Sequence, residues 1–554
     1  MVKFPIPAPL LWTGLWAVLV AVALFFRPLL PVDETRYVGV AWEMWLRGDF
    51  LVPHLNGEPY SHKPPLLFWL MQAGWSVLGV NEWWPRLISP AFGLGCVFLT
   101  AGLAKRLWPD RDIHLLAPLF LLGSVFWGLY TTLTMFDLIL TFWALVGIHG
   151  LVDAATAEQG GRRVRGWLLF AAGIGFGVLA KGPVILVFLL PPALFAPLWR
   201  DTGRSTGRTG GGNWVRWYLG ALAGVVLGAA IALAWALPAG FAGGEAYRNA
   251  IFWGQSAGRV VDSFDHGLPV WWYLPLLPVI LLPWIIWPTF WRAAGAWFWE
   301  HGGDSGTRLA AVWIAAALIA LSLISGKRPH YLLPMLPAMA LIGAGIIEYA
   351  VRRRRAGGWG DLLPWALAAL AFAAFVGFAP SIGPALELDV RRLDDWLTAY
   401  SPLWALAPLG AGLLLPFVAR RAGAASRMLG LAMVSAAILV TVHGVAGPQL
   451  GRAYDLKGIA FHLKDAQDRG YAIAHLGKYH GQYNFLGRLA PNIATTDSKK
   501  LRAWLERNPK AKIVGSTHRL TAGPAPEFTA PFRGRTVAVW DGRALLAVPK
   551  LETE

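Results

Sequence analysis

Acidic, basic and aromatic residues gather in one polar segment, residues 31–65, which lies between long apolar runs. Within it, Asp33, Arg36 and Tyr37 are spaced so that their side chains share one face of a helix. From this spacing, the Asp33 carboxylate could take part in catalysis. Asp33 also suits the N-cap of that helix, where it would accept hydrogen bonds from the first turn. The spacing leaves both interpretations open.

The helix expected at this place also has an apolar side. Glu43 precedes Arg47 by one helical turn, in the order that stabilises a helix. Tryptophans on an apolar helix face are typical of the headgroup layer of a membrane. We therefore expect this helix to lie at the membrane surface. Its apolar residues at helical spacing are Val38, Ala41, Trp42, Trp45 and Leu46.

Further polar residues stand at the ends of apolar runs. A charge in the middle of a membrane costs about 2.5–3.5 kcal/mol, so such groups are expected to pair or to line a cavity. Each has a simpler explanation: an N-cap for Asp137, snorkelling for Lys181, lipid headgroups for Lys327 and Arg328. Together they fit a cavity that binds a phosphate and a polar co-substrate. The residues are Asp137, Lys181, Arg248, Arg259, Lys327, Arg328, His330 and Tyr331.

Composition indicates a polytopic α-helical membrane protein. The 554 residues are 56% hydrophobic and include 31 tryptophans. The formal net charge of +17 clusters in short loops between apolar runs, which indicates membrane topology and gives no reason to expect a nucleic-acid partner. The single cysteine, Cys96, lies in an apolar run, so no intramolecular disulfide is expected.

Hydropathy predicts about thirteen spans, each of roughly 20 residues. The first is expected to be a retained anchor, and the loops rich in Lys and Arg place the amino terminus in the cytoplasm. The first loop (31–85), the loops 240–269 and 380–401 and the tail then face outward. The spans are expected near residues 9–30, 86–106, 114–132, 134–155, 166–182, 183–199, 217–239, 270–291, 308–325, 331–350, 362–379, 402–419 and 428–446.

The chain therefore divides into a transmembrane domain, residues 1–446, and an outward-facing α/β domain, residues 447–554. Helices over 454–469 and 498–507, strands over 471–476 and 511–515, and a hairpin turning at Asp541-Gly542 are expected in the second domain. It carries no catalytic motif. A capping or acceptor-positioning role is expected for it.

Four motifs in the first loop and just after it carry a family resemblance: D-E-T-R-Y at 33–37, P-H-L-N-G at 53–57, H-K-P-P-L at 62–66 and N-E-W-W-P-R-L at 81–87. With them the chain resembles the bacterial 4-amino-4-deoxy-L-arabinose transferases of lipid A. More broadly it resembles the membrane-embedded GT-C glycosyltransferases, which include the protein O-mannosyltransferases. Weaker matches follow at T-M-F-D, L-A-K-G and K-R-P-H-Y-L-L-P, so the motifs run in order along about two-thirds of the chain.

The resemblance implies a polyprenyl-phosphate sugar donor, used at the periplasmic face of the bacterial inner membrane with a lipid or glycan acceptor. Asp33 matches the family's first-loop aspartate and Asp137 its second functional acid. Arg259 and Tyr331 match residues that hold the lipid phosphate. The remaining site residues implied by the resemblance are Arg36, Tyr37, Tyr60, Lys63 and Lys181. Tyr60 and Tyr331 also suit the aromatic belt of a membrane interface.

One departure concerns a metal site. Aminoarabinose members of the family carry a glutamate before K-P-P, paired with a later histidine at a metal site, but here the first position is His62. No cofactor and no metal ligand are therefore assigned, although His62 and His266 could still meet. The same departure weakens the implication that the sugar is aminoarabinose.

The expected chemistry is an inverting displacement at the anomeric carbon as the lipid phosphate leaves. Lys63 and Arg259, with a hydrogen bond from Tyr331, would stabilise the phosphate, and Lys327 and Arg328 would assist. Transfer to a protein hydroxyl or to a cell-wall glycan is an alternative that the sequence does not separate from lipid A modification. A flippase of a charged lipid is a further alternative, but the chain shows no internal repeat. A lipid-binding scaffold would not require paired acids and cations.

Overall fold

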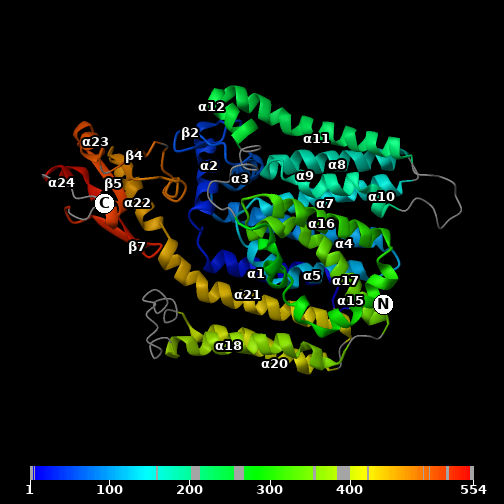
Figure 1. The fold of residues 1–554 in the computed structure, drawn as a ribbon. Helices are drawn as coiled ribbons and strands as arrows, with labels where there is room; N and C mark the ends of the chain where they lie inside the picture. The colour runs from blue at the N-terminus through cyan, green and yellow to red at the C-terminus, as the bar shows by residue number, and fades with distance from the viewer. Residues whose placement is uncertain are drawn as a thin grey trace.

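The computed structural model describes residues 4, 6–157, 160–200, 213–254, 268–353, 357–382, 400–420, 423–490, 492–497, 499–519 and 523–548. It shows a bundle of long apolar helices that carries a separate sheet domain at its carboxyl-terminal end (Figure 1). The expected fold class, a polytopic helical membrane protein with a small α/β domain, is confirmed.

Among the described residues, nine helices are long and apolar enough to cross a membrane, or ten if one bent pair is a single span. That pair, α5 (Ile113–Gly123) and α6 (Val125–Thr131), bends by 70° inside the expected span 114–132. The expected spans 183–199, 270–291 and 402–419 are shorter or interrupted helices. Prolines inside them explain the interruptions, because proline cannot donate the helical hydrogen bond.

The long helices are α1 (Ala8–Phe26), α4 (Trp83–Leu107), α7 (Asp137–Thr156), α8 (Gly160–Lys181), α11 (Trp214–Ala242), α16 (Ser305–Leu323), α17 (Leu336–Arg352), α18 (Leu363–Ile382) and α21 (Ala424–Tyr454). The shorter ones are α9 (Ile185–Leu194), α10 (Ala196–Trp199), α12 (Gly244–Asn249), η1 (Ala250–Gly254), η2 (Val270–Leu276), α14 (Leu277–Ile280), η3 (Trp284–Ile286), α15 (Pro288–His301), η4 (Pro329–Met335), η5 (Trp359–Leu362), η7 (Pro402–Ala405) and α20 (Leu406–Ala419).

Helices α7 and α8 form an antiparallel pair whose backbones approach closely through glycines. A Cβ atom added to Gly173 would lie 2.7 Å from the Cα of Gly147, and one added to Gly150 would lie 2.4 Å from the carbonyl oxygen of Gly166. Small residues of this kind let membrane helices pack backbone to backbone. Because α7 begins at Asp137 and α8 ends at Lys181, the same packing brings these two residues together.

The first loop folds as α2 (Asp33–Arg47), a short hairpin of β1 (His54–Leu55) and β2 (Glu58–Pro59), and α3 (Leu66–Leu78). The expected pair of Glu43 and Arg47 is present at 2.8 Å. The expectation that α2 lies in the headgroup layer is wrong, because Val38 and Ala41 are fully buried and the Trp42 indole donates to the carbonyl oxygen of Leu489. Helix α2 is packed between the bundle and the carboxyl-terminal domain.

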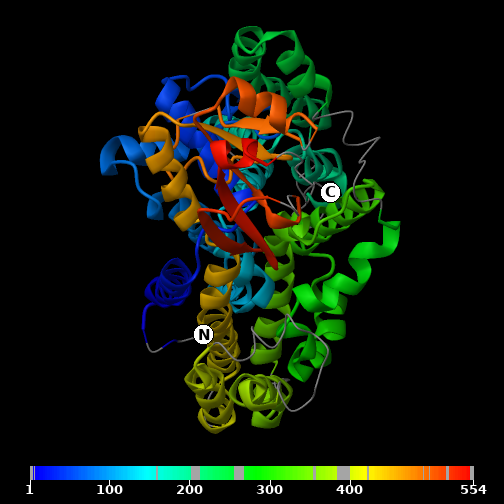
Figure 2. The same ribbon diagram turned by 90° about the vertical axis from the view of Figure 1, so that its left-hand side faces the viewer.

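The carboxyl-terminal domain begins where α21 leaves the bundle (Figures 1 and 2). Its sheet has the order β4-β3-β5-β7-β6, parallel from β4 to β5 and antiparallel from β5 to β6. The strands are β3 (Ala472–Leu476), β4 (Ala494–Thr496), β5 (Ala511–Ser516), β6 (Phe528–Phe532) and β7 (Arg535–Asp541), and the helices are α22 (Lys457–Asp468), α23 (Leu501–Arg507), η8 (Thr517–Arg519) and α24 (Gly542–Leu546).

The expected hairpin turn at Asp541-Gly542 is wrong. Asp541 instead caps α24, where its carboxylate accepts from the amides of Arg543 at 2.8 Å and Ala544 at 3.3 Å. The hairpin of β6 and β7 turns at Arg533-Gly534, where both residues have positive φ, 54° and 69°.

One face of the sheet shares a hydrophobic core with the first loop. Val514, Val537 and Val539 face the same cluster as Val38 of α2 and Phe68 of α3. The other face packs on α23 and α24 through its own core. The side chain of Asn56, at the turn between β1 and β2, exchanges two hydrogen bonds with the backbone of Ile493, at 2.8 and 2.9 Å. The first loop and the carboxyl-terminal domain are therefore docked by both apolar and polar contacts.

We expect Gly173→Ala to lower both the thermal stability in detergent and the activity of the protein. The added methyl group meets backbone atoms of α7, which cannot swing aside, and overpacking of this kind costs about 1–3 kcal/mol. The control is Gly161→Ala on the same helix, where an added Cβ meets nothing within 4 Å. Equal melting temperatures for the two variants would contradict the assigned role of the glycine contact.

Candidate active site between the first loop and the helix ends

Asp33 is the first residue of α2, and its carboxylate makes no capping hydrogen bond, so the N-cap interpretation is wrong. The side chain is 58% exposed and pairs with the Arg36 guanidinium, whose Cζ lies 5.7 Å from the centroid of the Tyr37 ring. The expected trio on one helix face is therefore present. Burial raises the pKa of the Tyr37 hydroxyl, and the negative charge of Asp33 raises it further. This tyrosine therefore remains a neutral hydrogen-bond donor.

Asp137 occupies the equivalent position, the first residue of α7, and it also caps nothing. Its buried carboxylate accepts from the Lys181 ammonium group at 2.5 Å. That ammonium group lies 4.6 Å from the centroid of the Tyr331 ring. Lys63 and His330 also interact electrostatically with Asp137. The N-cap interpretation of Asp137 and the snorkelling interpretation of Lys181 are both wrong, because the two residues pair with each other.

Aromatic rings connect the two acids. The Phe136 ring, next to Asp137, packs edge-on against Tyr37 at 4.9 Å and against Phe68 at 5.8 Å between ring centroids. The Lys63 ammonium group lies 5.6 Å from the centroid of the same ring, and the buried Tyr60 packs on Phe68 at 6.3 Å. Tyr37 experiences the charges of both Asp33 and Asp137. The structure thus brings the first-loop candidates together with Asp137, Lys181 and Tyr331, and their roles in binding stay predictions.

Lys327 and Arg328 were both expected to assist in binding a phosphate, but the structure places them in different surroundings. The buried ammonium group of Lys327 donates to the carbonyl oxygens of Leu268 at 2.8 Å and Ile324 at 2.7 Å. It therefore holds the end of α16 against the start of the segment that leads into η2. The positive charge of Arg328 interacts electrostatically with His330 and Tyr130, both of which also interact with Asp137. Arg259 and His266 lie outside the described residues.

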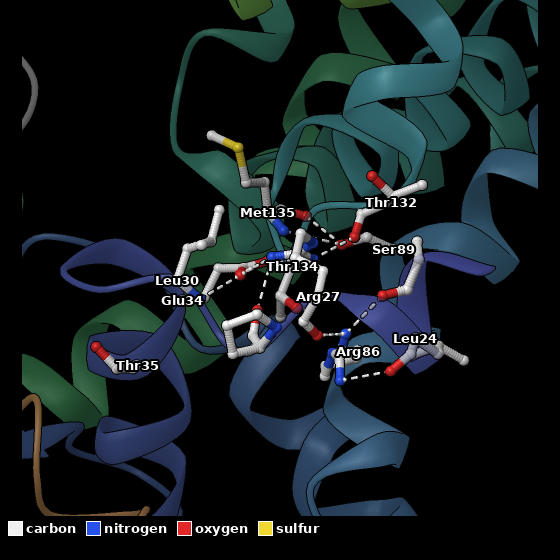
Figure 3. Close-up of polar contacts among 12 residues, drawn as sticks. Leu24, Arg27, Leu30, Glu34, Thr35, Arg86, Ser89, Thr132, Thr134 and Met135 are labelled. Carbon is white, nitrogen blue, oxygen red and sulfur yellow. Dashed lines mark hydrogen bonds and ion pairs between the residues drawn. The ribbon is translucent and has the colours of Figure 1, made fainter. Parts of the chain in front are cut away.

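A buried ion pair that the sequence did not single out links the chain segments that lead into the two acids (Figure 3). Glu34, the neighbour of Asp33, pairs with Arg27, which follows α1. One carboxylate oxygen of Glu34 accepts from the amide of Thr134 at 2.6 Å and the other from the amide of Leu30 at 2.7 Å, while Arg27 donates to the carbonyl oxygen of Thr132 at 2.6 Å. We call the pair of Arg27 and Glu34 the clamp.

The clamp joins three parts of the chain: the end of α1, the start of α2 and the segment that leads to Asp137. Arg86 of α4 extends it by donating to the carbonyl oxygen of Arg27 at 2.5 Å and to that of Ala23 at 3.0 Å. Burial alone would raise the pKa of Glu34, but Arg27 and the amide donors outweigh it and keep the pKa below its usual value. The acid next to Asp33 in D-E-T-R-Y and the arginine at the end of the first apolar run were the signals available in the sequence.

A metal site of the kind that the family resemblance implies is not visible in the described part of the chain. No three His, Cys, Asp or Glu side chains there are grouped so that they could hold a metal ion. The His62 ring instead packs at 5.3 Å from the Tyr60 ring. The residues described at this place do not form a metal site.

Comparison with known proteins finds similar membrane glycosyltransferases. Residues 10–240 match the family model of dolichyl-phosphate-mannose-protein mannosyltransferases. An undecaprenyl phosphate-alpha-4-amino-4-deoxy-L-arabinose arabinosyl transferase of Pseudomonas fluorescens is 27% identical over 420 residues, 72% of this chain and 73% of the relative. The enzyme of that name from Pseudomonas aeruginosa is 32% identical over 57% of this chain, and the alignment covers 55% of the relative's length.

Among solved structures, ArnT from Cupriavidus metallidurans bound to undecaprenyl phosphate superposes with a TM-score of 0.76 at 21% identity, over 98% of this chain and 99% of that one. The apo form of the same protein gives a TM-score of 0.73. The chain is a membrane glycosyltransferase, similar to those of the GT-C type. The family resemblance and the fold expected from the first-loop motifs are confirmed.

For this glycosyltransferase we expect Glu34→Ala to lower both stability and activity strongly. Removing one partner of a buried pair leaves Arg27 uncompensated, which costs about 3–5 kcal/mol. The double variant Arg27→Met with Glu34→Leu replaces the pair by apolar groups and should recover much of the melting temperature. It should not recover activity, because the bonds to Thr132 and Thr134 stay lost. Recovery of both quantities in the double variant would show that the clamp does not position the acids.

Proposed function

We propose that this glycosyltransferase moves 4-amino-4-deoxy-L-arabinose from an undecaprenyl-phosphate donor to a phosphate-bearing lipid acceptor of the lipid A type. The observation that carries the proposal is the cluster of Lys63, Lys181 and Tyr331 around Asp137, joined by aromatic rings to Asp33. The sugar and the donor are those in the names of the relatives from Pseudomonas.

The donor side of the reaction needs positive charge. As the bond between the anomeric carbon and the phosphate oxygen breaks, the electron pair stays on the phosphate and the sugar gains oxocarbenium character. Lys63 and Lys181, with a hydrogen bond from the Tyr331 hydroxyl, would stabilise the phosphate that leaves. Loss of one such donor costs about 3 kcal/mol of barrier in comparable sites.

The acceptor side lies at Asp33. Its carboxylate is half exposed and is fixed by Arg36, so it can orient an incoming group and stabilise positive charge on the sugar. An acceptor phosphate oxygen is already ionised at neutral pH, so it needs little base catalysis. The new bond forms on the face of the sugar opposite the departing phosphate, and the configuration at the anomeric carbon inverts.

The site and the carboxyl-terminal domain are proposed to face the periplasm. The helix ends away from Asp137 are rich in arginine: Arg106 pairs with Asp153 at 3.0 Å, near the other end of α7, and Arg352 pairs with Glu348. Loops rich in Lys and Arg stay in the cytoplasm. The domains proposed are a transmembrane catalytic part, residues 1–446, and a periplasmic part, residues 447–554.

The family model that matches residues 10–240 is that of protein mannosyltransferases, so transfer of mannose to a protein hydroxyl is the second candidate. The two functions differ in donor and acceptor. We expect the purified protein to transfer aminoarabinose from its undecaprenyl-phosphate ester to lipid A, detected by mass spectrometry. Transfer from a polyprenyl-phosphate mannose to a Ser/Thr peptide, with no transfer to lipid A, would overturn the proposal in favour of the second candidate.

We expect Asp33→Asn to lower kcat/KM by about a hundredfold or more, because the neutral amide can neither pair with Arg36 nor balance positive charge on the sugar. The matched control is Glu58→Gln, which neutralises an exposed acid in the same loop. Initial rates of sugar transfer and melting temperatures should be measured together. A folded Asp33→Asn variant with the wild-type rate would remove the carboxylate from the mechanism.

A further inference from the structure

Two segments of the carboxyl-terminal domain reach α2 and the residues just before it, near Asp33. The first, residues 477–484, follows β3 and contacts α2 at Gly39, where an added Cβ would lie 3.1 Å from the carbonyl oxygen of Gly481. The second is the turn between β6 and β7, where the guanidinium of Arg533 donates to the carbonyl oxygen of Pro31 at 3.1 Å. Pro31 is two residues before Asp33, so this hydrogen bond ties the turn between β6 and β7 to the segment that leads into α2.

The first segment is held by a buried polar network rather than left as a loose loop. The Tyr479 hydroxyl donates to the side-chain oxygen of Asn484, and the amide of His480 donates to the side-chain oxygen of Gln482 at 3.0 Å. Asn484 and Gln482 are buried, whereas Lys478 is exposed and His480 half-buried. The network therefore fixes the backbone from which Lys478 and His480 project.

Arg533 occupies a backbone conformation that arginine disfavours. Its φ of 54° is in the left-handed region, and Gly534 follows with a φ of 69°. Asn-Gly is the preferred pair in such a two-residue turn, and a non-glycine residue in this region costs about 1–2 kcal/mol. Strain of this kind concentrates at functional sites. The turn would be more stable with another residue, which indicates that the guanidinium itself has a use.

Positive charge exceeds negative charge at this place. Besides burial, the positive charges of Arg36, Lys478 and Arg533 all lower the pKa of His480. The Asp33 carboxylate has the opposite effect and raises it. Asp33 is already paired with Arg36. Within the described part of the chain, neither Lys478 nor Arg533 forms an ion pair with an acidic side chain. Burial, together with these three cations, lowers the pKa of His480, so the imidazole stays neutral and can donate a hydrogen bond.

We propose that Arg36, Lys478 and Arg533 form a binding site for a phosphate group of the acceptor lipid, so that the carboxyl-terminal domain supplies half of the acceptor site. The inference rests on the proposed function, because it assigns Asp33 to the acceptor side. The site takes a phosphate monoester presented at the end of α2. His480 donates the additional hydrogen bond that a phosphate oxygen accepts.

The test separates binding of the acceptor from folding and from donor binding. Arg533→Asn introduces the preferred Asn-Gly turn, so the melting temperature should stay within a few degrees of wild type, while the KM for lipid A rises about tenfold or more. Lys478→Ala, at an exposed position, should do the same. The KM for the undecaprenyl-phosphate donor should stay within about twofold. The control is Lys500→Ala, which removes an exposed cation that the proposal does not use.

Dephosphorylated lipid A serves as the comparison ligand, in direct binding to detergent-solubilised protein. We expect wild type to bind lipid A more tightly than its dephosphorylated form, with weaker binding at higher ionic strength, and Arg533→Asn to remove most of that preference. An unchanged preference, an unchanged KM for lipid A or a fall in kcat alone would overturn the inference. If wild type transfers no sugar from an undecaprenyl-phosphate donor, it is the proposed function that fails; an active wild type with unaffected variants rejects the acceptor site alone.

Discussion

The spatial relation of the two candidate carboxylates depends on the buried pair of Arg27 and Glu34. Burying two charges is expensive, and the cost is recovered only where further hydrogen bonds satisfy both groups. Here the bonds go to the backbone of Leu30, Thr132 and Thr134, so the pair fixes two chain segments rather than two side chains alone. One segment leads into Asp33 and the other into Asp137. A change in the clamp would therefore alter both acids at once.

Both acids then share a second feature, their position as the first residue of a helix. The amino-terminal end of a helix carries partial positive charge, which stabilises a carboxylate by about 0.3–1 kcal/mol without any capping bond. Because neither side chain caps its helix, each remains available to a partner: Arg36 for Asp33 and Lys181 for Asp137. The glycine contact between α7 and α8 sets the second of these pairs. The close packing of α7 against α8 thus determines that the charges of Asp137 and Lys181 meet at the ends of these helices.

Patterns along the chain were enough to predict most of the long apolar helices, the trio of Asp33, Arg36 and Tyr37, and two helices and two strands of the carboxyl-terminal domain, since each depends on neighbours within a few residues. The bond from the clamp to the segment before Asp137 could not be predicted in this way, because Glu34 and Thr134 are 100 positions apart. From the sequence, Lys327 was expected to help bind a phosphate, yet its ammonium group donates hydrogen bonds to two backbone carbonyl oxygens. The Asp541-Gly542 pair resembled a turn, although Asp541 caps a helix. In both cases a local signal fitted two structures, and tertiary contacts decided between them.

The shared hydrophobic core explains how a separate domain can take part in the site at all. Side chains of α22, β5 and β7 pack in the same cluster as those of α2 and α3, so the carboxyl-terminal domain cannot move away without exposing apolar surface. The ion pair of Lys457 with Glu82, at 2.8 Å, adds a contact between α22 and the residue before α4. Under the proposed function, helix ends in the bundle would form the donor side, and the junction between the first loop and this domain would form the acceptor side. In that arrangement, the donor and the acceptor would approach the same few residues from opposite sides.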